Sequence, residues 1–165
     1  MVEAGLIDPD ERIELIDGEI IVMGSEGEAH WSAKAALVNW IVRRLPDTIM
    51  LAPDGPLRLS DENEPEPDFY LYAATMNVNA VRGPDALLVV EIADTSLDKD
   101  RLVKAPLYAA HGVREYWIID LAARSTIVHR QLGANGYPQP QVASFDDLLT
   151  VQAAPALAFR LSDVL

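Results

Sequence analysis

Five consecutive apolar residues, Ala86 to Val90, restrict the fold of this 165-residue chain more than any other feature. A strand in an antiparallel sheet with one wet face alternates apolar and polar residues, whereas a strand covered on both faces is apolar throughout. The run therefore predicts a buried strand over about 85–92, in a sheet that other elements cover on both sides.

Glu91 directly follows this run and places a carboxylate in an otherwise apolar strand. Burying an ionised carboxylate is costly unless a cation pairs with it. Asp68 stands at the start of a second predicted strand, over 68–72, and residues near the ends of neighbouring strands can converge. Two such carboxylates suit a hard cation such as Mg²⁺. In the alternative interpretation, Glu91 ends its strand and faces water, or pairs with an arginine such as Arg114.

The N-terminal half carries a hairpin signal and a helix signal. Asp17–Gly18 lies between two apolar segments and predicts a turn in a hairpin over 14–23. Ser25 and Glu28 have the spacing of a capping box, and apolar residues at helical spacing follow. We therefore expect a helix over about 29–45.

The remaining patterns predict a mixed sheet with few helices. A second helix is expected over 99–111, with Asp98 as its cap and with Pro106 kinking or breaking it. Further strands are expected at 48–52, 56–59, 115–120, 126–131, 141–145 and 148–151. This order favours an α/β or α+β fold that forms a single domain over residues 1–165.

The second helix offers two interpretations of its faces. Residues three or four apart share a face, and one face here is polar: Arg101, Lys104, Tyr108 and His111. A lysine on that face could orient a metal-bound water or stabilise charge in a transition state. From the residues alone, the simpler account is a solvated face opposite an apolar one: Leu102, Val103, Leu107 and Ala110.

Glu14 and His30 are weaker candidates. Glu14 lies among apolar residues before the Asp17 turn and could be a third carboxylate, although an exposed position in an alternating strand is the simpler account. His30 is near the start of the first helix, where it could touch a phosphate or orient an acid. A lone histidine in that position is more often structural.

Composition excludes several classes of function. The chain has no cysteine, so disulfides, thiolate zinc sites and cysteine nucleophiles are excluded. No apolar stretch approaches the roughly 18–20 residues of a membrane-spanning helix, and Met1–Gly5 lacks the basic and apolar regions of a signal peptide. We therefore expect a cytoplasmic protein with no membrane partner.

The net charge limits the partners. Thirteen Lys and Arg against 26 Asp and Glu leave a formal charge of −13. Such acidity opposes tight non-specific binding to nucleic acid. It leaves room for an enzyme that meets phosphate through metal ions held by carboxylates.

Taken in order, several segments resemble the Uma-two family, restriction-endonuclease-like proteins of the PD-(D/E)XK nuclease superfamily. The resemblance covers roughly 5–150, and these pieces carry it: Glu14–Met23, His30, Glu64–Phe69, Val89–Ile92, Lys104, Tyr108 and Gly112–Asp120. It implies a restriction-endonuclease-like three-layer core, a mixed β-sheet flanked by helices. It also implies Mg²⁺-dependent hydrolysis of phosphodiester bonds in nucleic acid, most often DNA, with Mn²⁺ able to substitute.

The resemblance also implies roles for individual residues. Asp68 and Glu91 match the motif aspartate and acid, both metal ligands, and Glu14 matches an early glutamate that completes the metal site. The superfamily's lysine follows the acid by two residues, where this chain has Ala93. In this family the lysine moves to the next helix, which here gives Lys104. His30 and Tyr108 are expected to support the site.

Two other functions stay open. The first is a catalytically inactive nuclease-fold protein that serves as a binding or oligomerisation module, which the charge of −13 favours. The second is a hydrolase acting on something smaller than duplex DNA. In either case a homodimer is expected, because apolar strands around 116–130 and 141–151 could pair across a two-fold axis.

Overall fold

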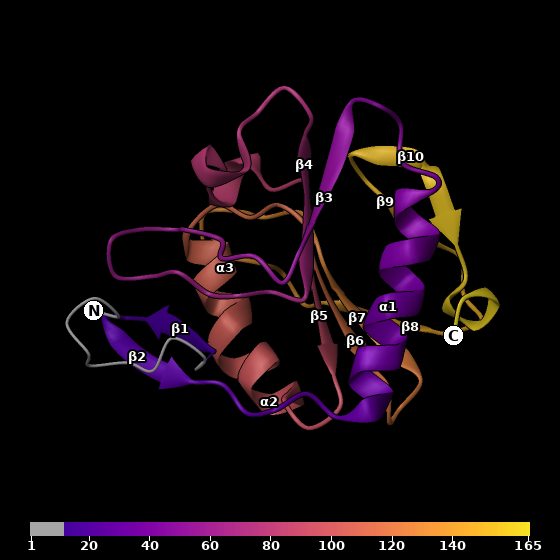
Figure 1. Ribbon diagram of the computed structural model, residues 1–165, viewed down its shortest axis with the longest axis horizontal. Helices are drawn as coiled ribbons and strands as arrows, with labels where there is room; N and C mark the ends of the chain where they lie inside the picture. Colours follow the sequence, from indigo (N-terminus) through magenta and orange to yellow (C-terminus); the bar gives the residue numbers. More distant parts are fainter. Residues whose placement is uncertain (1–11) are drawn as a thin grey trace.

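The computed structural model describes residues 12–165, in which a six-stranded mixed sheet forms the centre (Figure 1). The prediction about Met1–Gly5 lies outside the described residues. The strands run in the spatial order β3 (Ile49–Pro53), β4 (Phe69–Ala73), β5 (Leu88–Ala93), β6 (Tyr116–Asp120), β7 (Ser125–His129) and β8 (Gln141–Ser144). Only the β5–β6 pair is parallel among these neighbours. The predicted mixed α/β class is confirmed.

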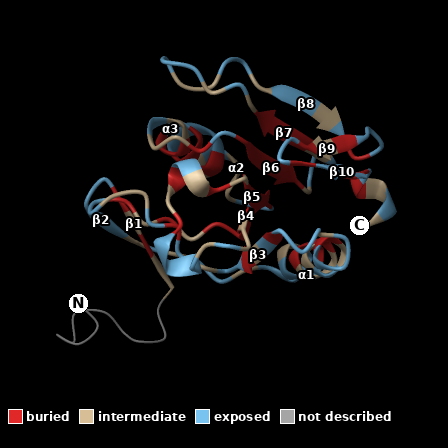
Figure 2. Cartoon of the chain, turned by 90° about the horizontal axis from the view of Figure 1, so that it is seen from above, coloured by how far each residue is buried: buried red, intermediate tan, exposed pale blue. Residues whose placement is uncertain are grey.

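Every residue of β5 is buried, as the apolar run predicts. Alternate residues of a strand point to opposite faces: Val90 and Ile92 join a core with Leu37 of helix α1 (Glu28–Val42). Val89 joins a second core with Tyr108 on the other face. Figure 2 shows buried residues concentrated in the sheet between these two helical layers. Glu91 is two residues after Val89, so its side chain points to the same face of the sheet as Val89, toward Tyr108.

The second helical layer is three short segments: α2 (Leu97–Lys99), a π-helical turn η4 (Asp100–Lys104) and α3 (Ala105–Ala110). It connects parallel strands β5 and β6, which require a crossover. Pro106 has no N–H to continue the helical ladder, and the π turn lies just before it, so the predicted break is confirmed. The predicted cap, Asp98, is instead inside the first turn, and Ser96 precedes α2.

The π turn also changes which side chains are buried. Each added residue rotates the following helix by ~100° relative to an uninterrupted one. Leu102 and Val103 are therefore exposed, whereas Lys104 and Tyr108 are buried. Of the apolar face expected from ideal helical spacing, only Leu107 is buried. The solvated position expected for Lys104 is wrong for the same reason.

Two hairpins complete the described chain. β1 (Ile13–Ile16) and β2 (Glu19–Val22) pair across Asp17–Gly18, both at positive φ, as predicted. β1 also pairs with the loop before β4, through backbone hydrogen bonds in both directions between Leu15 and Glu64. The second hairpin joins β9 (Leu149–Val151) to β10 (Ala154–Phe159) and packs on the α1 side of the sheet. Short 3₁₀ turns occur at Val78–Ala80, Gly83–Asp85 and Leu161–Asp163.

Two local predictions are wrong, and one strand was not predicted. Residues 56–59 are not a strand, because their N–H groups bond within a proline-rich loop, Leu57 N to the Pro65 carbonyl among them. β10 was not predicted, because the C-terminal tail carries no regular pattern, and the β9–β10 hairpin shifts register after Ala154. The capping box is absent: Gly27 is the N-cap of α1 and makes no side-chain capping bond.

The expected dimer surface is largely unavailable. β6 and β7 lie inside the sheet and are almost wholly buried. Only β8, an end strand of the described sheet, remains exposed, with Val142 at 69% exposure. The homodimer therefore stays a prediction that is confined to this edge. None of the helices in residues 12–165 is both long and apolar enough to cross a bilayer.

The contact between α1 and the sheet gives a test of the layered core. Leu37 is fully buried, whereas Leu102 is 71% exposed. We expect Leu37→Ala to lower the free energy of unfolding by about 2–5 kcal/mol, because it removes buried methyl groups and leaves a cavity. Leu102→Ala should change it by less than about 0.5 kcal/mol. Urea denaturation measures both, and equal losses would contradict this packing.

Candidate active site

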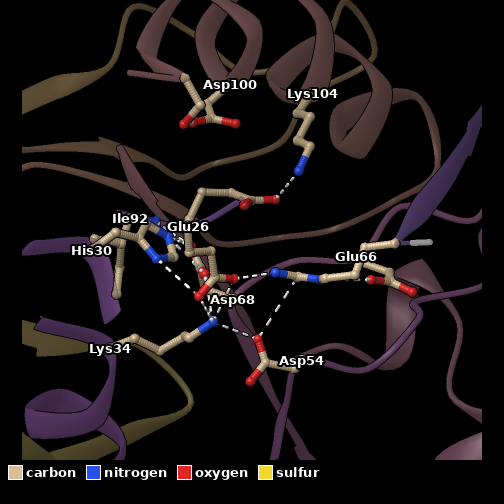
Figure 3. Close-up of polar contacts among 12 residues, drawn as sticks. Glu26, His30, Lys34, Asp54, Glu66, Asp68, Ile92, Asp100 and Lys104 are labelled. Atoms are coloured by element: carbon tan, nitrogen blue, oxygen red, sulfur yellow. Dashed lines mark hydrogen bonds and ion pairs between the residues drawn. The ribbon is translucent and has the colours of Figure 1, made fainter. Parts of the chain in front are cut away.

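A pocket of about 340 Å³ opens beside the C-terminal half of β5. The polar side chains that matter most in its lining are Glu26, His30, Asp68, Glu91, Asp100 and Lys104. They come from the start of α1, the residue before β4, β5 itself and the π turn. Figure 3 shows Glu26, His30 and Lys34 gathered around Asp68, with Lys104 and Asp100 on the helical segment that faces them.

Lys104 joins Glu14 to Glu91 inside the protein. Its Nζ lies 2.7 Å from Glu14 Oε1 and 2.8 Å from Glu91 Oε1, and its side chain is only 3% exposed. Burial would lower the pKa of Lys104, but the charges of Glu91 and Glu14 outweigh burial and raise it. The lysine is therefore an ammonium ion held between two carboxylates. Glu14 is fully buried, so the exposed position considered for it is wrong.

Glu91 is a buried carboxyl group whose pKa is raised although Lys104 pairs with it. Burial raises the pKa of Glu91 well above its ordinary value, and the charges of Asp100 and Asp68 raise it further. Tyr108 donates a hydrogen bond to Glu91 Oε1 over 3.1 Å. Burial raises the pKa of Tyr108 strongly, which keeps this hydroxyl protonated as a donor. Glu91 neither faces water nor pairs with Arg114, as the alternative interpretation required.

Asp100 is a third buried carboxyl group at this place. Its exposed fraction is 1%, and burial raises its pKa. Ser96 donates a hydrogen bond to Asp100 Oδ2 over 2.6 Å. Crowded buried carboxyl groups with raised pKa values are typical of functional sites, because a cation or proton must compensate them.

Asp68 is fixed by two hydrogen-bonding groups. The backbone N–H of Ile92 donates to Asp68 Oδ2 over 2.7 Å, and His30 Nε2 lies 3.0 Å from Oδ1. Burial lowers the pKa of His30, but the hydrogen bond and charge of Asp68 outweigh burial and raise it. His30 therefore contacts a carboxylate of the site and is not the lone structural histidine considered from the sequence.

Glu26 and Lys34 extend the network to the pocket mouth. Lys34 Nζ lies 2.6 Å from both Glu26 Oε2 and Asp54 Oδ1. Burial raises the pKa of Glu26, but hydrogen bonds from Lys34 and Arg12 outweigh burial and bring it to about 2. Glu26 is thus ionised, although it is part-buried.

Two overlapping sets of ligand atoms could hold a metal ion. Asp68 and Glu91 are the carboxylates expected from the sequence. A second set is Glu26, His30 and Asp68, whose ligand atoms all lie within 4.8 Å of one another. Carboxylate oxygens suit Mg²⁺ and Mn²⁺, and adding an imidazole nitrogen favours a transition metal.

The fold brings together all six candidates that the sequence suggested. Asp68, Glu91 and Lys104 are at the pocket, with His30 bonded to Asp68, Tyr108 to Glu91 and Glu14 to Lys104. Sequence reasoning missed Glu26, Lys34, Asp54 and Asp100. Lys34 follows His30 by one helical turn, which is a usable signal, but nothing local marked the other three.

Residues 3–162 match the model of the Uma2 family, described as "Putative restriction endonuclease". The chain belongs to the Uma2 family. Among solved structures it is similar to a crystal structure described as "a putative nuclease belonging to DUF820 from Anabaena variabilis ATCC 29413". That match has a TM-score of 0.75 and 18% identity, and covers 98% of this chain and 94% of the other. No curated protein matches.

The Uma2 assignment agrees with the resemblance seen in the sequence, and the Anabaena structure shares the fold. Together the family and the fold support a nuclease-type hydrolase with a nucleic-acid substrate. Which residues act, and with which ion, depends on the geometry of the pocket.

The buried position of Lys104 gives a test of this geometry. We expect Lys104→Met to lower the free energy of unfolding by about 3–5 kcal/mol, because two buried carboxylates lose their cation. Adding Glu14→Gln should recover part of that loss. Lys99→Met is the control, because Lys99 also pairs with Glu14 but is 32% exposed and should cost about 0–1 kcal/mol. Similar losses for Lys104→Met and Lys99→Met in urea denaturation would contradict the buried pairing.

Proposed function

We propose that this Uma2 protein is a metal-dependent endonuclease that hydrolyses phosphodiester bonds of DNA. The observation that supports this most is a group of three buried carboxyl groups, Asp68, Glu91 and Asp100, with only two buried ammonium groups beside them. Lys104 Nζ lies 2.8 Å from Glu91, and Lys34 Nζ lies 3.5 Å from Asp68. Negative charge exceeds positive charge there, although burial disfavours charge of either sign. Such a centre gains stability from a cation.

The side chains fit a divalent ion. Asp68 and Glu91 are the expected ligands, because they offer carboxylate oxygens from the beginning of β4 and from β5. Burial raises the pKa of Glu91 and of Asp100 because it makes their charged forms costly, and a positive ion beside them would offset that cost. When bound, Mg²⁺ or Mn²⁺ supplies a water of lowered pKa and offsets the charge that develops on the phosphate.

The protein's own groups position this centre. His30 and the Ile92 N–H hold the Asp68 carboxylate in one orientation. Tyr108 does the same for Glu91. Lys104 keeps its ammonium beside Glu91, where it can donate a hydrogen bond to the attacking water or to a phosphate oxygen. Glu14 has a positioning role, because it fixes Lys104 from the side away from Glu91.

The distribution of cations answers part of the objection from a net charge of −13. Basic side chains gather at this pocket and its mouth: Arg12, Lys34, Lys99 and Lys104. Most of them pair with acids, so the approach of a phosphate depends on local rather than overall charge.

Titration with Mn²⁺ tests the metal centre directly. In calorimetry we expect the metal-stripped protein to bind one or two ions, and both Asp68→Asn and Glu91→Gln to abolish binding while the fold is retained. Cleavage of plasmid DNA should fall by more than about a hundredfold in each variant, because the ion supplies several kcal/mol of transition-state stabilisation. Glu62→Gln, an exposed acid outside the pocket, should leave both unchanged.

The same titration separates the two sets of ligands. If Asp68 and Glu91 hold the ion, His30→Gln should weaken binding by about 10–100-fold, as expected for a group that orients a ligand. If Glu26, His30 and Asp68 hold it, then His30→Gln and Glu26→Gln should both abolish binding, and Glu91→Gln should not. Equal binding by all variants would overturn the metal centre. Metal binding without cleavage of DNA or RNA would favour the inactive binding module.

A further inference from the structure

Lys34 places its ammonium group between two members of the second set of metal ligands, Glu26 and Asp68 (Figure 3). Its Nζ lies 2.7 and 2.6 Å from the two oxygens of Glu26 and 3.5 Å from Asp68 Oδ1. Asp54 Oδ1 lies 2.6 Å away on another side. The side chain of Lys34 is only 8% exposed. An ammonium group that is surrounded in this way by oxygens of three carboxylates has the environment of a bound cation.

The ligand atoms of this second set are already engaged by groups of the chain itself. Both oxygens of Glu26 accept hydrogen bonds from Lys34. Asp68 accepts a hydrogen bond from the Ile92 N–H on Oδ2, and His30 Nε2 lies 3.0 Å from Oδ1. An ion that used Glu26 as a ligand would therefore have to displace an ammonium group.

Electrostatic repulsion opposes a divalent ion at this set while Lys34 is in place. Mg²⁺ binds carboxylate oxygens at about 2.1 Å, so an ion on Glu26 would lie within about 5 Å of the ammonium nitrogen. Like charges at that separation repel strongly in a part-buried site, because the protein screens them less than water does. Burial would lower the pKa of Lys34, but hydrogen bonds to Asp54 and Glu26 outweigh burial and raise it, so Lys34 keeps its charge.

The Glu91 side of the pocket differs, because there a carboxylate oxygen is left for an ion. Lys104 and Tyr108 both bond to Oε1 of Glu91, and Oε2 has no hydrogen-bond partner among residues 12–165. Asp100 adds a further carboxyl group there, 1% exposed. Lys104 is also shared with Glu14. One side of the pocket thus has a cation built into the chain, and the other side has negative charge that the chain leaves uncompensated.

We propose that Lys34 takes the place of a cation at the Glu26–His30–Asp68 set, so that the pocket binds one divalent ion, on the Asp68–Glu91 side. Lys34 does not line the pocket. It is therefore a positioning residue, which neutralises Glu26 and holds Asp68 without touching the substrate. This inference rests on the metal centre proposed above, and it fixes the number of ions and gives Lys34 a role.

Calorimetric titration of the metal-stripped, full-length protein with Mn²⁺ at pH 7 measures the number of ions. We expect one ion in the wild type and two in Lys34→Gln, because removal of the ammonium group frees both oxygens of Glu26. The second ion should bind with a Kd below about 1 mM. Adding Glu26→Gln to Lys34→Gln should remove the second ion again. Arg43→Gln changes an exposed arginine at the C-terminal end of α1 and should keep one ion.

Electron paramagnetic resonance of the bound Mn²⁺ shows where the second ion lies. Two ions that share the Asp68 carboxylate lie about 3.5–4 Å apart, as in two-metal sites, and their spins couple. We expect the six-line spectrum of an isolated ion in the wild type, and a spin-coupled spectrum in Lys34→Gln with two equivalents of Mn²⁺. A second ion elsewhere on the surface would leave the spectrum uncoupled.

Stability gives a readout that is independent of cleavage. Lys34→Gln leaves three carboxylates without their shared ammonium group, so the metal-free variant should unfold at a lower temperature than the wild type. Mn²⁺ should raise the unfolding midpoint of Lys34→Gln more than that of the wild type, because it replaces the lost charge. If Lys34→Gln does not fold, Glu26→Gln alone decides the matter: its Mn²⁺ affinity should stay within about tenfold of the wild-type value, because Glu26 holds Lys34 and not the ion.

Four results would overturn the role of Lys34: two ions in the wild type with one lost in Glu26→Gln, a single ion in folded Lys34→Gln, an uncoupled second ion, or loss of the only ion in Glu26→Gln. Absence of Mn²⁺ binding by the wild type would instead overturn the proposed metal centre. Lys34→Gln should then still bind one ion through Glu26, His30 and Asp68, and if it bound none, the role of Lys34 would be overturned as well.

Discussion

The buried contact of Lys104 with Glu14 and Glu91 ties together three parts of the chain that are distant in sequence. Glu14 belongs to the N-terminal hairpin, Glu91 to the central strand and Lys104 to the crossover helix. Removing one charge from such a group leaves the others buried and uncompensated. The hairpin shares little apolar core with the sheet, so it is held at the pocket by this contact and by hydrogen bonds to the loop over 62–66, the pairing of Leu15 with Glu64 among them.

The π turn makes this contact possible. Asp100 and Lys104, its first and last residues, are both buried on the pocket side. In a continuous α-helix with the expected apolar face, Leu102 and Val103 would pack inward and the lysine would reach solvent. Pro106 just after the turn disfavours the regular ladder. The local irregularity of the helix thus supplies both a carboxyl group and an ammonium group to the pocket, and π turns are frequent at functional sites.

The sequence predicts the parts of this structure that depend on local pattern. The apolar run with Glu91 gave the buried strand, and Asp17–Gly18 gave the hairpin. Lys104 was expected in solvent on helical spacing alone, because a π turn leaves no periodic signal. Glu26 and Asp100 could not be found, since each gains its meaning from residues brought near by folding. The prediction of a strand at 56–59 failed because the backbone partners of these residues lie in a loop. The strand β10 was not predicted because the C-terminal tail carries no regular pattern.

The position of Ala93 explains why a lysine from the helix is suited to this pocket. The superfamily's motif places its lysine two residues after the acid, which is on the same face of the strand. Here Ala93 is 1% exposed and packs in the core with Ala105 and Tyr108. A lysine at this place would have to displace the helix that lies across β5. With the strand position filled by a small residue, the helix can approach closely, and Lys104 reaches Glu91 from above the sheet at 2.8 Å. On the proposed assignment of Glu91 as the motif acid, the ammonium group comes from the crossover helix instead of the strand, and close packing of helix on strand is the physical condition for that exchange.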